Sequence, residues 1–344
     1  MNKYVHQKSG SVFLSAIAAI MLAVLLAACG TESATGINQA VSKEPASGKN
    51  SSVEAAKPQM RTFTDDLGRK VEIPVTPTRV IVNDFSAEMI AIGVKPIAAG
   101  NNDFKITFIK NELAAGVDSI GDPPNAEKIL QLSPDLIVMS TVAHDIYPKV
   151  VEQLEKVAPV VYFSFEQDPI YETFPKIADA VGKPQQAKQW IEDYEQDMKR
   201  SREKVKTVIG DETVSVFRIE KGRLRIYLNR NFAGYMLRTS LQTKAPAAVA
   251  AEIAKNKYGS AVEISLEKLP EYAADHMFII VRGQGDDQAA FKEIENSAIW
   301  RNLPAVRKGN LHFIDTDKYY GVDIITIRET MKEAADMLAK RTGN

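Results

Sequence analysis

Cysteine is almost absent from this sequence, since Cys29 is the only one among 344 residues. The chain beyond it therefore has no disulfide and no thiol chemistry, and its core alone must hold the fold together. The chain is long enough to bury such a core. An excess of charge is absent too, because 43 Lys and Arg against 44 Asp and Glu leave a formal net charge of −1. This balance gives no indication of a nucleic-acid binder.

Catalytic motifs are also lacking from the sequence. It contains no Gly-x-Ser-x-Gly motif and no Walker A loop, and the Gly-x-Gly of residues 282–287, RGQGDD, predicts only a loop. Of the four histidines, His6 lies in the leader, His276 and His312 fall in expected strands, and His144 falls in an expected loop. No two of them have the spacing of zinc ligands, so we expect no direct metal site. Because the catalytic motifs are also missing, we expect no catalytic residues.

The first 28 residues predict a secretory signal. Lys3 and Lys8 form a positive segment, and an apolar run that ends in small residues follows it. This pattern is typical of a signal peptide rather than of a spanning helix in the mature chain. Residues 26–30, LAACG, resemble a bacterial lipobox, which implies cleavage before Cys29 and attachment of a lipid to its thiol. An ordinary signal peptide that contains a cysteine by chance is the alternative.

Residues 29–58 are rich in Ser, Ala, Lys and Glu and contain almost no large apolar side chains. Such a segment cannot bury a core, so we expect a flexible tether. Together with a lipid on Cys29, it would hold the protein at the extracellular face of the cell membrane, within reach of a partner there.

The remaining chain alternates short apolar strands with helices, which predicts an α/β fold of βα units around mainly parallel sheets. Residues 61–74 predict an initial hairpin. A helix that starts at Lys183–Pro184 continues for more than 20 residues without Gly or Pro, and we expect it to join two lobes as a strut. The predicted domains are an N-terminal lobe over 59–180, an interlobe helix over 181–210 and a C-terminal lobe over 211–344, with a ligand cleft between the lobes.

A repeated pattern supports two similar lobes. AEKILQLSPDLIVMS at 126–140 and LEKLPEYAADHMFII at 266–280 both open with Glu-Lys-aliphatic and later place an Asp before an apolar run. The interval from Glu127 to Asp135 equals the interval from Glu267 to Asp275. We interpret the two stretches as the same βα element, once in each lobe.

Open α/β sheets bind ligands at the carboxyl ends of their strands, so the loops there are candidate ligand contacts. They are residues 83–85, 101–105, 122–124, 141–144 and 317–320. A second candidate is the segment FRIEKGRLRIY at 217–227. If its Lys-Gly pair forms a two-residue turn, Arg218 lies opposite Arg225, and Tyr227 shares their face. This face is either a solvated basic surface or an anion site, and Glu220 could be the carboxylate between the arginines.

Four motifs, in their order and spacing, resemble those of the iron-siderophore-binding lipoproteins of ABC importers, the cluster A solute-binding proteins. They are FTDDLGRKVEIPVTPTRVIV at 63–82, SPDLIVMS at 133–140, ISLEKLP at 264–270 and AIWRNLPAVRKGN at 298–310. The resemblance implies two α/β lobes joined by a rigid long helix. It also implies a protein, expected to be monomeric, that is not an enzyme, that captures a ferric chelate and that delivers it to a permease.

The resemblance extends to single residues. It implies that Glu127 and Glu267, one in each lobe, pair with arginines of an ABC permease dimer. Each glutamate could instead simply complement the dipole of a short helix. The family's binders of tris-catecholates carry Arg-x-Arg, whereas here Arg218 is followed by Ile and then Glu220. A carboxylate would repel such an anionic ligand.

We therefore expect a ferric hydroxamate or a mixed citrate-hydroxamate rather than a catecholate. Tyr320 matches a pocket tyrosine of hydroxamate binders. The expected ligand contacts are Arg218, Tyr320, Arg225, Tyr227 and Lys105. The iron would be held by the siderophore, so no cofactor and no direct metal ligand is expected.

Other functions stay open at this point. Within the same fold the ligand could be a catecholate, cobalamin or haem. From another class, the chain could be an exported α/β enzyme that uses Asp84, Asp103 or His144, although no nucleophile-base pair is evident. A surface adhesion or sensor lipoprotein is a further alternative.

Overall fold

The computed structural model of the chain describes residues 58–231, 233–281 and 286–340, which belong to one compact unit over 56–344. The signal peptide, Cys29 and the expected tether up to residue 57 lie outside the described residues, as does most of the Gly-x-Gly segment at 282–285. Within the described ranges, no helix combines the length and the apolar character that crossing a membrane requires.

The described chain begins with the expected hairpin, β1 (Met60–Thr64) paired antiparallel with β2 (Lys70–Pro74). Asp65 builds the turn, because its carboxylate accepts hydrogen bonds from the backbone N–H groups of Leu67 (3.1 Å) and Arg69 (3.0 Å). The guanidinium of Arg69 also donates to Asp65 and to the carbonyl oxygen of Val160, so the hairpin is attached to the N-terminal lobe.

The sheet of the N-terminal lobe is wholly parallel and has the order β5-β4-β3-β6-β7. Its strands are β3 (Val80–Val82), β4 (Ala98–Ala99), β5 (Asp118–Ser119), β6 (Leu136–Ser140) and β7 (Val160–Phe163). The connecting segments are α1 (Ser86–Ala91), η1 (Asp103–Lys105), α2 (Lys110–Ala114), α3 (Ala126–Leu132), α4 (Thr141–Ile146) and α5 (Pro148–Leu154). Every residue of β3, β6 and β7 is buried, as expected for strands covered on both faces.

The sheet of the C-terminal lobe is mixed and has the order β10-β9-β8-β11-β12. Its strands are β8 (Val214–Glu220), β9 (Arg223–Tyr227), β10 (Ala261–Ile264), β11 (His276–Val281) and β12 (Leu311–Phe313). The hairpin predicted at 217–227 is confirmed, because β8 and β9 pair antiparallel, and β10 adds to β9 in antiparallel orientation, while β11 and β12 are parallel to their neighbours. The reason for the hairpin is local: Lys221 and Gly222 both have positive φ (52° and 69°), as in the two-residue turns that reverse a chain.

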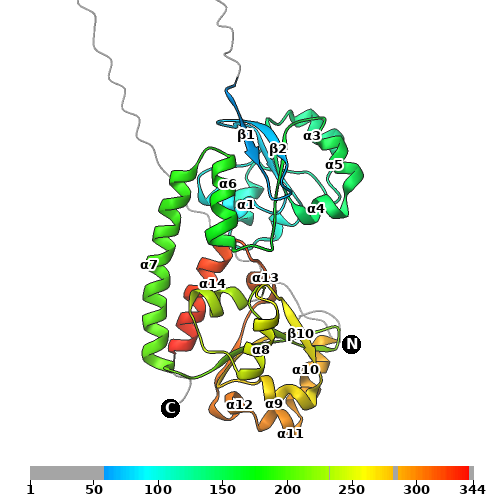
Figure 1. Cartoon of the computed structure of the whole chain (residues 1–344). Helices are drawn as coiled ribbons and strands as arrows, with labels where there is room; N and C mark the ends of the chain where they lie inside the picture. The colour runs from blue at the N-terminus through cyan, green and yellow to red at the C-terminus, as the bar shows by residue number, and fades with distance from the viewer. Residues whose placement is uncertain (1–57, 232, 282–285, 341–344) are drawn as a thin grey trace, which may run out of the picture. The chain divides into compact units, whose positions relative to one another are not determined.

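Helices cover this second sheet. They are α8 (Ala247–Lys255), η4 (Leu266–Lys268), α9 (Leu269–Tyr272), α10 (Asp287–Glu295), α11 (Ala298–Arg301), α12 (Pro304–Lys308) and α13 (Thr316–Tyr319). Figure 1 shows α8, α9 and α10 around the lower lobe and α3, α4 and α5 around the upper one.

The sequence repeat has a structural counterpart in the two sheets. In the N-terminal lobe, Asp135 accepts hydrogen bonds from the N–H (2.7 Å) and hydroxyl (2.9 Å) of Thr78, just before β3. In the C-terminal lobe, Asp275 accepts from the N–H (3.0 Å) and hydroxyl (2.9 Å) of Thr213, just before β8. Each Asp thus fixes its own strand beside the start of the parallel neighbour, so the prediction of one βα element per lobe is confirmed.

A long helix runs from one lobe to the other, and a second helix packs beside it. After η2 (Pro169–Thr173) and α6 (Phe174–Ala180), α7 (Pro184–Ile209) begins at the expected proline. Its 26 residues span roughly 39 Å at 1.5 Å per residue. Helix α14 (Ile324–Ala339) packs along α7, and Figure 1 shows it beside the lower part of α7, which alone spans both lobes. One face of α7 is buried against the core, so the helix is more than the solvated strut expected.

One hydrophobic core joins the lobes. The same cluster of buried side chains contains Val82 and Phe163 from the first sheet and Val214 and Phe278 from the second. Two further clusters fill the outer layers, one in each lobe. The described part of the chain therefore has the predicted α/β architecture with two lobes and a long connecting helix. The exact domain boundaries at 59, 180, 210 and 344 stay predictions.

Candidate ligand-binding site

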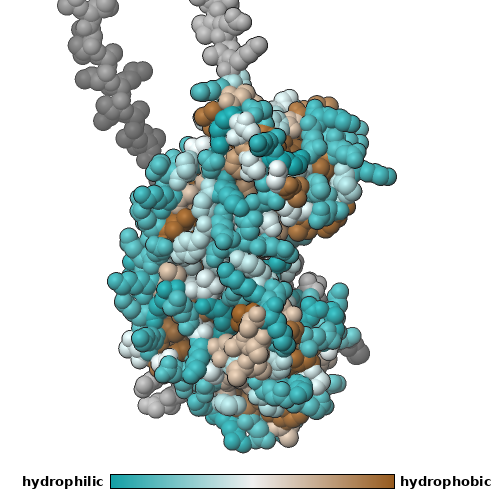
Figure 2. All heavy atoms as spheres, in the orientation of Figure 1, coloured by the Kyte–Doolittle hydropathy of each residue, from teal (hydrophilic) through white to brown (hydrophobic). Residues whose placement is uncertain are grey.

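A cavity of about 520 Å³ lies between the lobes and is lined by residues of both. Figure 2 shows a hydrophilic surface that is hollowed between the upper and lower lobes. Four of the five segments expected at strand ends contribute to its lining, through Asp84, Asn102, Val142 and Tyr320. Both lobes build this cavity, and it has room for a small ligand.

The N-terminal wall of the cavity follows the rule for parallel sheets. Asp84 and Phe85 come directly after β3, and Ser164 and Phe165 come directly after β7. Phe85 is buried against Phe165, with ring centroids 5.1 Å apart. The carboxyl ends of neighbouring parallel strands meet at one edge, and this places their polar and aromatic residues together.

Asp103 gives this wall its shape. It is 1% exposed, and its carboxylate accepts hydrogen bonds from the backbone N–H groups of Asp84 (2.9 Å), Ser86 (2.9 Å) and Gly100 (3.1 Å). The helix α1 consequently begins at Ser86, with Asp103 binding the N–H of that residue. Burial raises the pKa of Asp103 to about 7, although its backbone donors act in the opposite direction.

Asp84 is the carboxyl group of this wall that lines the cavity. Its backbone has a positive φ of 82°, and the hydroxyl of Ser140 donates to its side chain at 2.6 Å. Burial raises the pKa of Asp84, and the bond from Ser140 opposes this rise. The same hydroxyl accepts from the N–H of Ala143 at 3.1 Å. Because Ser140 caps α4 in this way, β6 continues directly into a helix. The prediction of a loop at 141–144 is therefore wrong.

The C-terminal wall carries the cations of the cavity, Arg230 and Lys257. Arg230 donates from Nε to the amide oxygen of Asn231 at 3.3 Å, and Lys257 lies over the ring of Tyr258. Across the described ranges, neither cation forms an ion pair with a carboxylate. Their charges are therefore available to oxygen atoms of a ligand.

Sequence reasoning missed this wall for a topological reason. Tyr227, at the end of β9, lies opposite Val216, near the start of β8. Because β9 is antiparallel, residues 229–231 emerge at the edge where β8 begins, and the rule for parallel strands does not point there. The cluster Asn-Arg-Asn directly after a strand was the available signal in the sequence.

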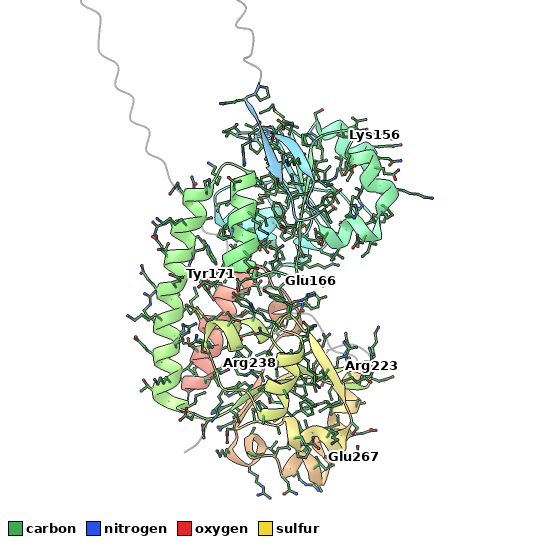
Figure 3. The ribbon with its side chains drawn as sticks, in the orientation of Figure 1. Lys156, Glu166, Tyr171, Arg223, Arg238 and Glu267 are labelled. Carbon is green, nitrogen blue, oxygen red and sulfur yellow. The ribbon has the colours of Figure 1, made fainter. Side chains whose placement is uncertain are left out.

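The two walls meet at Asp168 and Tyr235. The phenol of Tyr235 donates to the carboxylate of Asp168, with oxygen distances of 2.9 and 3.0 Å. Asp168 also accepts from the N–H of Ile170 at 3.0 Å and so caps η2. Burial and the charge of Asp168 raise the pKa of Tyr235, which keeps its proton for this bond. Figure 3 shows the nearby Glu166 and Tyr171 where the chain passes between the lobes.

Glu88 and Asp323 form the floor of the cavity, one from each lobe. Glu88 is 3% exposed on α1, and Asp323 is 8% exposed as the N-cap of α14. The N–H of Ile324 donates to Oε1 of Glu88 at 3.3 Å, which joins the two helices. Burial first, and then the charge of Asp323, raise the pKa of Glu88, and burial also raises the pKa of Asp323.

Of the five expected ligand contacts, Tyr320 lines the cavity. Its side chain is 58% exposed, and it follows α13 at the cavity mouth. Lys105 is exposed in η1 and donates to the amide oxygen of Asn102 at 2.8 Å, so a residue of the lining is its hydrogen-bond partner. Contact of Tyr320 and Lys105 with a ligand stays a prediction.

Arg218, Arg225 and Tyr227 share a face of the β8–β9 hairpin, with the register expected from the turn. Arg218 is buried and donates to the phenol oxygen of Tyr227 at 2.8 Å and to Glu220 at 3.0 Å. Arg225 pairs with the other oxygen of Glu220 at 3.1 Å. Glu220 is thus the carboxylate between the two arginines. None of the three residues is among those lining the cavity, and their role as ligand contacts stays a prediction.

The histidines have protein partners. His144 lies on α4 and contacts Asp145 at 3.0 Å. His276 and His312 lie in β11 and β12 as expected, with ring nitrogens 3.2 Å apart, and burial lowers the pKa of His312 to about 4. In the part of the chain that the structure describes, no group of three or more His, Cys, Asp or Glu side chains is arranged to hold a metal ion.

Glu127 and Glu267 are exposed in the first turns of α3 and η4, one in each lobe. Within the described residues neither carboxylate forms an ion pair. Backbone N–H groups and Ser265 lower the pKa of Glu267, so it is ionised at neutral pH. Figure 3 shows Glu267 at the end of its lobe that lies away from the other lobe. Their docking role stays a prediction.

Two α/β lobes, a long helix between them and a cavity where they meet define the class of two-lobed solute-binding proteins. A family model described as periplasmic binding protein matches residues 89–318, and this chain belongs to that family. The relationship confirms the fold class expected from the sequence.

Two relatives come from Bacillus subtilis (strain 168). The iron(3+)-hydroxamate-binding protein YxeB is 30% identical over 298 residues, which cover 86% of this chain and 90% of the relative. The iron(3+)-hydroxamate-binding protein FhuD is 27% identical over 343 residues, or 98% of this chain and 99% of the relative.

A solved structure from the same species is similar as well. It is described as a FhuD fold-family periplasmic binding protein component of a Fep/Fec-like ferrichrome ABC transporter. It shares 27% sequence identity with a TM-score of 0.70, and the match covers 81% of this chain and 100% of that one.

Proposed function

We propose that this protein captures a ferric siderophore in the interlobe cavity and delivers it to the permease of an ABC importer. One observation carries the proposal. The cavity of about 520 Å³ lies between the lobes of a chain whose relatives, over 86% and 98% of its length, are named iron(3+)-hydroxamate-binding proteins. This volume is within the usual range for sites that bind small molecules.

The ligand class that we propose is a ferric hydroxamate or a mixed citrate-hydroxamate. A ferric trihydroxamate is close to neutral, whereas a ferric tris-catecholate carries about three negative charges. The cavity contains two cations, Arg230 and Lys257, but also the carboxyl groups of Asp84, Asp168 and the two floor residues. Asp84 and Asp168 would repel a strongly anionic chelate at close range, whereas Glu88, whose pKa is raised to about 8, holds a proton at neutral pH.

Arg230 and Tyr320 are the contacts that the cavity supports best. A guanidinium donates several hydrogen bonds in a fixed geometry and suits the oxygen atoms of a chelate. A tyrosine combines ring area with a polar tip, which suits a bulky and partly apolar ligand. Arg218, with Arg225, Tyr227 and Lys105, stays a second set of predicted contacts.

We further propose that the protein has no catalytic activity and no cofactor, and that it acts as a monomer anchored through Cys29. The carboxyl groups named above for an enzyme have other roles, because Asp103 binds three backbone N–H groups and Asp84 accepts from Ser140. The iron would remain inside its chelate throughout transport.

Calorimetric titration tests the function and the contacts together. The wild-type protein is titrated with a ferric trihydroxamate, a ferric citrate-hydroxamate and a ferric tricatecholate. We expect the first or second to bind and the Arg230→Ala and Tyr320→Ala variants to weaken that binding about tenfold, as for a lost hydrogen bond to a charged group or a lost aromatic contact.

Arg218→Ala tests the hairpin contacts in the same titration, and Arg301→Ala, on the surface of α11, is the matched control. If Arg218→Ala alone weakens binding, the site lies on the hairpin face instead. If the wild type binds none of the chelates, the proposed function is wrong. Binding of the tricatecholate only would overturn the ligand class.

A further inference from the structure

The cavity floor contains two carboxylate oxygens without a partner. Oε1 of Glu88 accepts from Ile324 N–H at 3.3 Å, and Oδ1 of Asp323 accepts from Thr326 N–H at 2.8 Å. The other oxygens, Oε2 of Glu88 and Oδ2 of Asp323, are buried and have no hydrogen-bond partner among the described residues. Both residues belong to the lining of the cavity.

Burying two such groups together is unfavourable without a donor. An unpaired buried polar group costs a few kcal/mol, and an unpaired buried charge costs more. Two charged groups lie near Glu88, Asp323 at the start of α14 and Asp103 in η1. Both are acidic, so their charges disfavour ionisation of Glu88. The cations of the cavity, Arg230 and Lys257, belong to the opposite wall and pair with neither floor residue. The fold therefore buries two carboxyl groups together, which raises the pKa of both and leaves a proton on Glu88 at neutral pH, and a bound cation could take the place of that proton.

The chemistry of the missing group is that of a primary ammonium. An ammonium carries one positive charge and three N–H donors, so it can bind both open oxygens at once and compensate a carboxylate charge. A neutral amide N–H could bind one oxygen but would leave the charge buried. Two carboxyl groups from different lobes, joined through the Ile324 N–H, form a small built subsite rather than a solvated acidic surface.

Resting on the proposed function, we infer that Glu88 and Asp323 form a subsite at the cavity floor for a primary ammonium group carried by the ferric chelate. The oxygen atoms around the iron then lie toward Arg230, Lys257 and Tyr320, and the aminoalkyl arm extends to the floor. Charge of opposite sign on the two walls gives the ligand a defined orientation. The protein consequently prefers linear hydroxamates with a free amine over their neutral counterparts.

A matched pair of ligands tests this inference. The first is a linear ferric trihydroxamate with a terminal primary amine, and the second is the same chelate with that amine acetylated. Their dissociation constants are measured by calorimetry at neutral pH and constant salt. For the wild type we expect the amine to bind about tenfold more tightly, which is the effect of one charge-assisted hydrogen bond in a buried site.

Two nearly isosteric variants locate the effect. Glu88→Gln and Asp323→Asn each keep the oxygen that accepts from the backbone and lose the ability to ionise when an ammonium binds. Each should bind the two chelates with nearly equal affinity, and circular dichroism spectra and melting temperatures measured alongside show whether each variant is folded. Glu329→Gln, a surface carboxylate of the same helix that pairs with Lys332, should retain the full preference.

The possible failures can be told apart. Equal affinity of the wild type for both chelates would overturn the ammonium subsite and leave the proposed function standing. A preference that persists in both Glu88→Gln and Asp323→Asn would also overturn it, because the selectivity would then arise elsewhere. If the wild type bound neither this pair nor any other ferric chelate, the proposed function and the subsite would both be wrong.

Discussion

At the scale of single residues, the carboxyl groups determine the shape and the charge of the cavity. Asp103 holds one wall through three backbone N–H groups, and Asp168 joins the walls through Tyr235. Glu88 and Asp323 differ from these, because each keeps a buried oxygen without a partner among the described residues. These four carboxyl groups thus have three distinct roles. The residue type alone does not predict which role each of them has.

The stability of the protein should depend on pH through Glu88. Its pKa is raised to about 8 by burial and by Asp323, so the folded state holds a proton that the unfolded state releases above the ordinary pKa of 4.5. The free energy of unfolding should therefore fall as pH rises from about 4.5 to about 8. Glu88→Gln cannot ionise and should be more stable than the wild type at pH 9, by on the order of 1–3 kcal/mol.

Melting temperatures of both proteins between pH 4.5 and 9 check this expectation. The two curves should nearly coincide at the acidic end and separate as the pH rises. Parallel curves over the whole range would show that Glu88 has an ordinary pKa in the folded protein. Glu329→Gln, whose carboxylate is on the surface, should follow the wild-type curve.

At the scale of elements, α7 connects the lobes. Tyr194 is fully buried on the inner face of α7, where its hydroxyl donates to Ser240 at 2.7 Å and its ring stacks on Trp190 with centroids 5.7 Å apart. Burial raises the pKa of Tyr194 well above its ordinary value, so the phenol remains a donor. The helix is thus attached to the C-terminal lobe through η3 (Met236–Ser240).

Tyr194→Ala should lower the free energy of unfolding by about 3–5 kcal/mol, because it leaves a large cavity and removes the partner of Ser240. Glu192→Ala, on the exposed face of the same helix, should change it by less than about 0.5 kcal/mol. Urea denaturation followed by circular dichroism measures both. Similar effects of the two substitutions would mean that the inner face of α7 adds little to the core.

At the scale of the whole molecule, the two lobes present equivalent exposed glutamates and share one core. If Glu127 and Glu267 dock the lobes on a permease dimer, Glu127→Ala or Glu267→Ala should reduce cellular uptake of the ferric chelate at least about tenfold, the usual effect of losing a buried interfacial ion pair. Affinity of the isolated protein for the chelate should not change. Glu152→Ala, an exposed glutamate of α5, is the control.

Uptake and chelate binding are measured on the same variants. A loss of affinity in the isolated Glu127→Ala or Glu267→Ala protein would assign these residues to the site or to the fold instead. Normal uptake by both variants would leave helix-dipole complementarity as their only role.

The attachment of the whole molecule to the membrane depends on Cys29, which lies outside the described residues. Cys29→Ser should move the protein from the membrane fraction to the medium, because no thiol remains for a lipid. Immunoblots of the two fractions measure the change. A variant that stays with the membrane at the wild-type level would contradict the lipid anchor.

The sequence by itself determined the local structure and the class of the protein. The register of Arg218 with Arg225 followed from a two-residue turn, and the start of α7 followed from Pro184, because both depend on neighbours along the chain. The repeat around Asp135 and Asp275 predicted two equivalent lobes because each Asp binds the first residues of an adjacent parallel strand. The partners of these two contacts lie 57 and 62 residues apart in the sequence, and each contact stays within one lobe.

Only the tertiary structure decided which residues face the ligand. The two-residue turn predicted that β9 pairs antiparallel with β8, but it did not predict that Arg230, beyond the end of β9, would line the cavity. Glu88 meets Ile324 across 236 residues of sequence, where no periodicity relates one position to the other. Glu88 is buried because the two lobes pack on one shared core, and this burial leaves one of its oxygens without a partner among the described residues. It is a property of the assembled fold and not of any one segment.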